Sequence, residues 1–338
     1  MFPTRDSNLD TDALAHEVLA HYPIGEITRC RFHARGLNDT YKVETKSGKS
    51  YFLRVYRAGW RTREQIEAEL TVLQHLAHCH VSVSTPVIRT DGALLTPLDC
   101  AEGERWAVLF TAAPGEEVDF KSYTQGQAGR YGEVAAAIHG AADGVAENFK
   151  RAALDLDLLL NEPLALIEPV IAHRRADLAY LAVLAKQLRN NIENAPGLEK
   201  GFCHGDLHGH NAGYADETFT VYDFDCCGWG YRAYDLAVFP WAFAIGEHAP
   251  DRIESMARAY LTGYLRHRAV KSVDLAAIPT FVAIRQIWLT GLHVGLADRF
   301  GWGFLNDRYF DRQLRVLRNW QEHFLDRPVE DWLPRGSS

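Results

Sequence analysis

The pattern of residues changes about one third of the way along the chain, and this change limits the folds available to it. Before about residue 111, short runs rich in aromatic and β-branched residues alternate with Gly-containing turn signals, which is typical of strands. After Pro114-Gly115, apolar residues recur mainly at helical spacing. A strand-rich part followed by a longer helical part predicts an α+β chain with two lobes.

The individual elements follow from the same patterns. In the first part we predict helices over 12–21 and 64–77, and strands over 31–33, 41–44, 51–56, 87–89, 92–97 and 106–111. In the second part we predict helices over 125–142, 154–160, 163–190, 233–245, 251–266, 274–297 and 307–324. Residues 212–223 form a predicted hairpin with its turn at 215–217. The predicted domains are an N-terminal lobe over 1–111, a hinge over 112–117, a helical lobe over 118–330 and a tail over 331–338.

Composition excludes some partners and environments. The net charge of −8 argues against nucleic acid and is compatible with a cationic substrate. No signal peptide is visible, and the apolar run 236–246 is about half as long as a bilayer span requires, so we expect no membrane partner. The six cysteines show no paired spacing, which predicts free thiols and a cytoplasmic protein.

The segment Cys203–Gly230 carries the strongest functional signal. It contains His204-Gly-Asp206-Leu-His208-Gly-His210-Asn211, in which Asp206 can accept or orient the proton of an attacking hydroxyl and Asn211 can hold Mg²⁺. Asp223 follows twelve residues after Asn211, at the end of a predicted strand, and suits the same Mg²⁺. Asp225 can hold a second Mg²⁺ or face the acceptor. The set predicts phosphoryl transfer, in which a protein supplies positioning and charge.

Two other interpretations of this segment remain open. His204, Asp206, His208 and His210 alternate, and on a strand they would share one face like the ligands of a transition metal. Alternatively, the loop is a polar turn beside a buried strand, and the two later aspartates are solvated turn residues. Gly205 and Gly209 favour a tight loop over a regular strand, which weakens the case for a metal hydrolase.

A buried carboxylate is predicted on the helix over 64–77. Glu69 lies within the apolar stripe of this helix, where an unpaired charge would be costly. Arg54, on the strand over 51–56, is its natural partner, and a strand cation held by a helix Glu and pointing at phosphates is the arrangement of kinases. The alternative is that Glu69 lies at the rim of the stripe and reaches solvent.

Other candidate residues give weaker signals. The loop Arg35–Tyr41 has a single Gly and can cover phosphates with backbone N–H groups and the side chains of Asn38 and Thr40. A Walker-type phosphate loop is absent from the sequence. His139 is expected to be a core histidine, and Asp235 to hydrogen-bond the backbone of the 204–211 loop. Arg285 and Trp288 are expected to line an acceptor pocket, and the alternative for Trp288 is a place in the core.

At these residues the chain resembles the aminoglycoside phosphotransferase and choline kinase superfamily. The resemblance rests on His-Gly-Asp-Leu-His-x-x-Asn, Asp-Phe-Asp and Gly-x-x-x-Tyr-Asp-Leu-Ala, and it extends from about residue 27 to 325. Residues 51–57, Glu69 and the region around Arg285 and Trp288 resemble the bacterial stress-response kinase and type II homoserine kinase branches. The resemblance implies a two-lobed protein-kinase-like fold, with a small strand-rich N-lobe and a larger helical C-lobe.

The resemblance also implies roles for particular residues. Asp206 would be the catalytic aspartate, Asn211 and Asp223 the Mg²⁺ ligands, and the hinge Phe110-Thr111-Ala112-Ala113 the contact for the adenine of ATP. The family usually has Lys where Arg54 stands, and Arg has a different shape although it also binds phosphate.

The sequence therefore predicts an ATP- and Mg²⁺-dependent phosphotransferase that acts on a hydroxyl of a small molecule such as an aminoglycoside, an amino alcohol or a sugar. A protein Ser/Thr kinase of the stress-response type is the alternative acceptor class. A transition-metal hydrolase and a non-catalytic nucleotide-binding module are the alternatives from other classes. The predicted substrate contacts are His208, His210, Asp225, Arg285 and Trp288.

Overall fold

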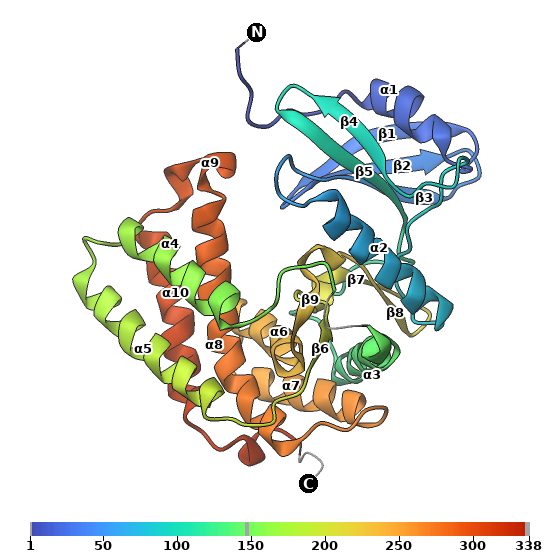
Figure 1. Cartoon of the computed structure of the whole chain (residues 1–338). Coiled ribbons are helices and arrows are strands. Elements are labelled where there is room, and N and C mark those ends of the chain that lie inside the picture. Colours follow the sequence, from blue (N-terminus) through green and yellow to red (C-terminus); the bar gives the residue numbers. More distant parts are fainter. Residues whose placement is uncertain (1, 146–148, 335–338) are drawn as a thin grey trace. The chain divides into compact units, whose positions relative to one another are not determined.

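The computed structural model describes residues 2–145 and 149–334 (Figure 1). They form two compact units. The first unit runs to Pro114 and includes Thr220–Tyr222, and the second contains Gly115–Phe219 and continues from Asp223. The first unit is rich in strands and the second in helices, so the predicted α+β class is confirmed.

The first unit is built on a five-stranded antiparallel sheet of order β1-β2-β3-β5-β4. Its strands are β1 (Ile27–Arg35), β2 (Asp39–Thr45), β3 (Ser50–Val55), β4 (Thr96–Cys100) and β5 (Gly103–Thr111). Side chains alternate between the two faces of a sheet, so alternate residues of β2, β3 and β5 share one face. That face is the core, where Tyr41, Leu53 and Leu109 are almost fully buried. The N-terminal helical segment, which consists of α1 (Thr11–Ala13), η1 (Leu14–Val18) and η2 (Leu19–His21), packs on it through Leu14 and Val18 (Figure 1).

Helix α2 (Arg63–His78) lies against the opposite face of the sheet, where Arg54 of β3 contacts Glu69 of the helix. Thr62 caps its N-terminus, since its side chain accepts from the Gln65 N–H while the Gln65 side chain accepts from the Thr62 N–H. Its apolar stripe is buried, as the spacing predicts.

Two strand predictions in the first unit are wrong in position. Residues 87–89 do not form a named strand, and β4 begins at Thr96 rather than at residue 92. A tight turn occupies the segment between them: the Gly92 N–H donates to the Arg89 carbonyl, the Arg89 N–H donates to the Ala93 carbonyl, and Gly92 has a φ of +85°. Asp91-Gly92 is a turn signal that outweighs the branched residues before it.

A buried charge cluster in the first unit was not predicted. The Arg105 guanidinium is fully buried and donates to Asp39 Oδ2 at 2.7 Å and to the backbone carbonyls of Tyr56 and Val55. Two further residues belong to the cluster: Arg35 Nε lies 2.9 Å from Asp39 Oδ1, and Glu102 Oε1 lies 3.3 Å from Arg105 Nη1. A buried ion pair is tolerated when hydrogen bonds satisfy its remaining donors, and here strand carbonyls do so.

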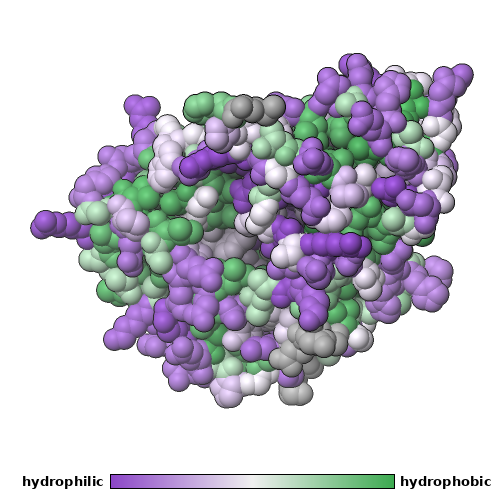
Figure 2. Space-filling view, turned by 45° about the horizontal axis from the view of Figure 1, so that its top comes forward, coloured by the Kyte–Doolittle hydropathy of each residue, from purple (hydrophilic) through white to green (hydrophobic). Residues whose placement is uncertain are grey.

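The second unit is organised around helix α8 (Ser272–Gly295), which packs against α4 (Glu162–Val170), α5 (Arg175–Glu193), α6 (Arg232–Ile245) and α10 (Asp307–Trp320). Helix α8 is long and apolar enough to cross a membrane, but 78% of its apolar window is buried inside the protein. Helix α8 therefore has the composition of a core helix. The outer face drawn in Figure 2, by contrast, shows hydrophilic residues interspersed with apolar ones.

The other helical elements of the second unit are one closely packed pair of helices and several short segments. Helices α3 (Gln125–Ala141) and α7 (Pro250–Leu265) pack together closely, because Gly132 and Gly263 bring their backbones into contact. The short elements are η3 (Ala142–Gly144), η4 (Asp157–Asn161), η5 (Gly209–Asn211), η6 (Phe224–Cys226), α9 (Ala297–Phe300), η7 (Trp302–Phe304), η8 (Gln321–Leu325) and η9 (Val329–Asp331).

The single helix predicted over 163–190 is wrong, because the structure has two. Helix α4 ends at Val170 and α5 begins at Arg175. Pro169 lies inside α4 and cannot donate the backbone hydrogen bond that would continue the helix, and the chain turns immediately afterwards. The apolar spacing on both sides of the turn is similar, so periodicity alone did not reveal the break.

Two small sheets complete the second half of the chain. Strands β7 (Ala212–Ala215) and β8 (Thr218–Val221) form the predicted hairpin, and its turn residues Asp216 and Glu217 have positive φ values. Strands β6 (Lys200–Cys203) and β9 (Gly228–Tyr231) form an antiparallel pair that was not predicted. Since Cys203 pairs with Gly228, the loop that starts at residue 204 and the turn that ends at residue 227 leave the same end of this pair.

The predicted tail over 331–338 begins too early. Trp332 and Leu333 are almost fully buried, and the Trp332 ring lies 4.9 Å from the Phe324 ring and 5.9 Å from the Trp320 ring. Burial of a large indole contributes on the order of 3 kcal/mol, so these residues belong to the core. Residues 335–338 of the predicted tail lie outside the described residues.

Candidate active site

The loop after β6 is held in place by one buried carboxylate. Asp235, on α6, accepts the backbone N–H of His204 at 2.7 Å and that of Gly205 at 2.8 Å. It also contacts His139 Nε2 at 3.0 Å, and His139 Nδ1 lies 2.8 Å from the Tyr264 hydroxyl. The predicted hydrogen bond from Asp235 to the loop and the core position of His139 are both confirmed. These contacts fix the backbone just before Asp206.

Gly205 allows the loop to pack closely against the turn that follows Asp223. Its φ is +80°, and a Cβ atom there would overlap the Cys226 carbonyl oxygen. The His204 ring lies 4.3 Å from the Phe224 ring. Glycine is therefore required at position 205 both for its backbone conformation and for the close contact. The loop that contains Asp206 and the turn after Asp223 are therefore packed directly against each other.

Asp206 is anchored through one of its two carboxylate oxygens. Arg285, on α8, donates from Nη2 to Asp206 Oδ1, and His208 Nε2 lies 3.3 Å from the same oxygen. Burial raises the pKa of Asp206, but the Arg285 charge outweighs this effect and holds that pKa well below its usual value. Among the described residues, no group hydrogen-bonds to Oδ2, and the Asp206 side chain is 21% exposed. The carboxylate is ionised and offers one oxygen outward.

Asn211 lies beside Asp206. Its Nδ2 atom donates to the Asp206 backbone carbonyl at 2.9 Å, and it lies 3.5 Å from His208 Nε2. Since the amide nitrogen faces the loop, the amide oxygen faces away from it, and that oxygen has no hydrogen-bond donor among the described residues. A hard cation prefers such oxygen ligands, so Asn211 fits a Mg²⁺ site.

The two later aspartates differ in their environment. Asp223 is exposed and has the left-handed backbone conformation, with φ at 64°. Asp225 is 1% exposed and its Oδ1 lies 3.6 Å from the buried Arg151 guanidinium. The reading of Asp225 as a solvated turn residue is therefore wrong. Its carboxylate is held inside the protein.

The histidines of the loop do not assemble a metal site. His208 Nδ1 accepts the His210 backbone N–H at 3.2 Å, and His204 Nδ1 accepts the Asp206 N–H at 3.2 Å. The His210 ring packs 4.3 Å from the Phe120 ring, and burial lowers the His210 pKa. Across residues 2–145 and 149–334, no three His, Cys, Asp or Glu side chains converge on a possible metal position. The set required by the transition-metal hydrolase is not brought together.

In the first unit, the predicted pair of Arg54 and Glu69 is confirmed. Arg54 Nη1 lies 2.9 Å from Glu69 Oε1, and the Tyr56 hydroxyl donates to Glu69 Oε2 at 3.1 Å. Glu69 is 1% exposed, so the rim alternative is wrong. The Arg54 guanidinium also lies 4.9 Å from the centre of the Phe110 ring. A buried carboxylate with two donors fixes the direction of the Arg54 side chain.

The remaining candidates of the first unit lie in strands or packed loops. The loop between β1 and β2 is shorter than predicted, because Thr40 belongs to β2. Asn38 is buried, and its side-chain oxygen accepts the Arg57 N–H at 3.2 Å. Thr111 ends β5 with its hydroxyl bound to the Thr85 N–H, and the Ala112 N–H donates to the Ser50 carbonyl. Their predicted contacts with nucleotide remain predictions.

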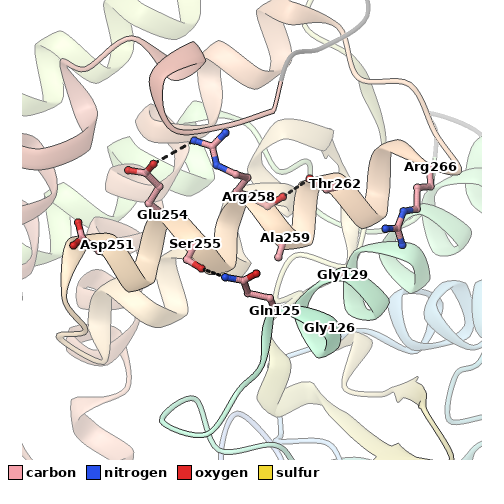
Figure 3. Close-up of a pocket in the computed structure, with 10 residues that line it drawn as sticks. All are labelled: Gln125, Gly126, Gly129, Asp251, Glu254, Ser255, Arg258, Ala259, Thr262 and Arg266. Carbon is pink, nitrogen blue, oxygen red and sulfur yellow. Dashed lines mark hydrogen bonds and ion pairs between the residues drawn. The ribbon is translucent and has the colours of Figure 1, made fainter.

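An open hollow of about 640 Å³ lies elsewhere, between α3 and α7, and contains none of the predicted site residues (Figure 3). Arg258 pairs with Glu254 and Arg266 pairs with Glu133, while Gln125 donates a hydrogen bond to the Ser255 hydroxyl. Gly126 and Gly129 contribute no side chains to its floor. The hollow is a surface feature of the helix pair.

The anchor of the loop predicts how stability depends on pH. Burial lowers the His139 pKa below 6.5. Just below pH 6.5, His139 is therefore protonated in the unfolded chain but remains neutral in the folded protein. Asp235 has a pKa below 3.8, because the contacts with His139 and the loop outweigh its burial. Stability therefore falls as the pH drops below about 6.5, and again below about 4, with each proton contributing at most about 1.4 kcal/mol per pH unit.

Chemical denaturation of the wild type and of His139→Asn at successive pH values tests this expectation. The stability of the variant is expected to be lower at neutral pH and to fall less steeply below about pH 6.5. The exposed His323, replaced by Asn, serves as the matched control and leaves the slope unchanged. Equal slopes for all three proteins would contradict the assignment to His139.

A strand-rich unit with a strand Arg paired to a helix Glu, and a helical unit with a His-x-Asp-x-x-x-x-Asn loop, define the class of kinase-like phosphotransferases. The chain belongs to the phosphotransferase enzyme family, whose model matches residues 29–270. The predicted family resemblance and the protein-kinase-like fold are confirmed.

The chain is also similar to individual proteins. An uncharacterised protein of Deinococcus radiodurans is 40% identical over 325 residues, which cover 95% of this chain and 93% of that protein. A homoserine kinase of Brucella ovis is 29% identical, with 81% of this chain and 82% of that protein covered. Among solved structures, an amicoumacin kinase in complex with AMP-PNP, Ca²⁺ and amicoumacin superposes with a TM-score of 0.75 at 18% identity and covers 96% of this chain and 97% of its own. The chain is a phosphotransferase.

Proposed function

We propose that this protein transfers the γ-phosphoryl group of ATP to a hydroxyl group of a small molecule in a Mg²⁺-dependent reaction. The observation that carries the proposal is the geometry of Asp206, whose Oδ1 is anchored by Arg285 and His208 while Oδ2 accepts no hydrogen bond from the described residues. An ionised carboxylate held in this way is suited to orient an attacking hydroxyl. The homoserine kinase and amicoumacin kinase relatives are named for small substrates, which supports an acceptor of that kind.

The chemistry assigned to Asp206 is limited to the proton and the position of the acceptor. The acceptor oxygen forms a bond to the γ-phosphorus, and the bond from that phosphorus to the bridging oxygen breaks, so that this oxygen leaves with ADP. The hydroxyl proton passes to Asp206 Oδ2 and from there to solvent. Because the transition state is loose, orientation of the hydroxyl contributes more than strong basicity, which suits a carboxylate with a lowered pKa.

The residues of the second unit fit a divalent cation. Asn211, whose amide oxygen accepts no hydrogen bond from the described residues, and the exposed Asp223 would hold Mg²⁺. The bound cation would supply positive charge against the phosphate oxygens.

The first unit supplies the proposed nucleotide contacts. Arg54, held by Glu69, would bind the phosphates, and Asn38 and Thr40 would contribute to the cover above them. Phe110, Thr111 and Ala112 would contact the adenine. Arg can present two parallel donors to a phosphate, so its fixed direction is compatible with the role usually filled by Lys.

A thermal unfolding titration tests the proposal. Mg·ATP is expected to stabilise the wild type by about 2.7 kcal/mol at roughly 100 times its Kd, because a ligand that binds only the folded state shifts the equilibrium. Asp223→Asn preserves the left-handed backbone but removes the charge, and it is expected to abolish the Mg²⁺-dependent part of the shift. Phosphate transfer to homoserine, 1-amino-2-propanol and a basic protein then separates the acceptor classes.

Asp216→Asn is the matched control, because Asp216 is also exposed and also has a positive φ, at 47°. It is expected to respond to Mg·ATP like the wild type. Stabilisation by zinc or manganese alone, without any effect of nucleotide, would contradict the proposal. Nucleotide binding without turnover in the presence of every acceptor would indicate a binding module.

A further inference from the structure

Arg285 occupies an unusual position for a charged residue. It is 1% exposed and lies in the middle of the core helix α8. Its guanidinium lies 4.2 Å from the centre of the Trp288 ring and 4.6 Å from that of Trp241 on α6. A guanidinium is planar and more weakly hydrated than an ammonium group, so indole rings stabilise it where water is excluded. The side chain is held in one orientation by its surroundings.

The guanidinium of Arg285 donates both to the Asp206 side chain and to the backbone of the catalytic loop, residues 204–211. Nη2 donates to Asp206 Oδ1, while Nη1 donates to the Gly205 carbonyl and to the Tyr234 hydroxyl, each at 3.1 Å. Arg285 therefore fixes the carboxylate and the peptide unit immediately before it. The Arg285 side chain is 2% exposed and that of Asp206 is 21% exposed, so the arginine lies behind the carboxylate rather than beside an incoming substrate.

His208 completes the anchoring of Oδ1. Its Nδ1 atom accepts the His210 N–H, which leaves Nε2, 3.3 Å from Asp206 Oδ1, as the ring nitrogen that donates to the carboxylate. Two donors converge on Oδ1 and none of the described residues donates to Oδ2. The two oxygens of the Asp206 carboxylate therefore differ: Oδ1 is held by the protein, and Oδ2 remains available to another group.

We propose that Arg285 is the positioning residue of the phosphoryl transfer: it holds Asp206 by Oδ1 and by the adjacent peptide, so that Oδ2 alone orients the acceptor hydroxyl. The inference rests on the function proposed above. It replaces the expectation that Arg285 itself contacts the acceptor. Lysine cannot fill this position, because a single ammonium group has no planar fork to reach Asp206, Gly205 and Tyr234 together, and it stacks less well between two indoles.

Arg285→Lys keeps the charge and tests the geometry. The rate at saturating Mg·ATP, with water and with homoserine as acceptors, is expected to fall on the order of 100-fold, because a displacement of about 1 Å at a positioning group has effects of that size. The Kd for Mg·ATP and the KM for ATP are expected to remain unchanged. Arg174→Lys is the matched control, since Arg174 is also largely buried and ion-paired, with Asp177 and Asp311 in the second unit, but it has no contact with the loop.

A double-mutant cycle separates positioning from general support of the fold. If Arg285 acts through Asp206, Arg285→Lys is expected to cause little further loss in an Asp206→Asn background. Independent, multiplying losses would overturn the positioning role, and so would an Arg285→Lys enzyme as fast as the wild type or a rate loss explained entirely by weaker Mg·ATP binding. A wild type that turns over no ATP with any acceptor would overturn the proposed function and this role with it.

Discussion

Asp206→Asn is expected to lower kcat on the order of 1,000-fold while the affinity for Mg·ATP stays close to that of the wild type. The substitution keeps the shape of the side chain and a hydrogen bond to Arg285, but it replaces the charged oxygens with a neutral amide. Loss of a positioned acid–base group typically costs two to four powers of ten in rate. Nucleotide binding is unaffected because Asp206 acts on the acceptor. The measurements are steady-state kinetics and calorimetric titration with Mg·ATP.

Asparagine is preferred to alanine for this test because of the buried arginine. Asp206→Ala would leave Arg285 with neither the carboxylate charge nor a hydrogen-bond acceptor there, and breaking a buried pair from one side costs about 3 to 5 kcal/mol of stability, whereas the amide oxygen of asparagine still accepts from Arg285. Asp326→Asn is a suitable control, since Asp326 is exposed in the same unit and, among the described residues, accepts a side-chain hydrogen bond only from the half-buried Gln187. A kcat within a few fold of the wild type in Asp206→Asn would show that Asp206 has no catalytic role.

Gly205→Ala is expected to destabilise the second unit by about 2 to 5 kcal/mol and to abolish most of the activity. A side chain in this left-handed conformation costs about 1 kcal/mol, and the overlap with the Cys226 carbonyl adds the cost of forcing two backbone segments apart. Since Asp206 is the next residue, any shift of the loop displaces the carboxylate. Denaturant unfolding and kcat are the quantities to measure.

Gly48→Ala separates the two contributions. Gly48 has a φ of +79°, almost equal to that of Gly205, but nothing lies within 4 Å of the position its Cβ would take. Its substitution is expected to cost about 1 kcal/mol and to leave kcat unchanged. If the two variants lose equal stability, the contact with Cys226 does not constrain the loop.

The sequence predicted the site better than its surroundings. The stripe of α2 predicted that Glu69 is buried, and the energetic requirement for a partner identified Arg54 correctly. The same reasoning led from Tyr-Asp-Leu-Ala to the hydrogen bonds of Asp235. These inferences succeeded because a buried charge must find a partner, and few partners were available within the pattern.

Contacts between residues far apart in the chain could not be predicted from the sequence. Nothing in the spacing linked Arg285 to Asp206, since they are 79 positions apart and join elements with unrelated patterns. Strands β6 and β9 were missed because four residues each, rich in glycine, give little periodicity. Asp39 and Arg105 were missed because their pairing depends on the register of the sheet, which the spacing does not give. The only available signal was at Arg285, a charged residue within the mostly apolar run 281–289.

The membership of Thr220–Tyr222 in the first unit bears on how the chain folds as it is synthesised. The Ser84 N–H donates to the Val221 carbonyl and the Val221 N–H to the Ser82 carbonyl, so this short segment supplies main-chain partners to residues made much earlier. A ribosome that has released only residues up to 114 has produced a unit that still lacks these partners. Chains generally fold unit by unit from the N-terminus. Here the first unit is completed only when the catalytic loop itself has been translated.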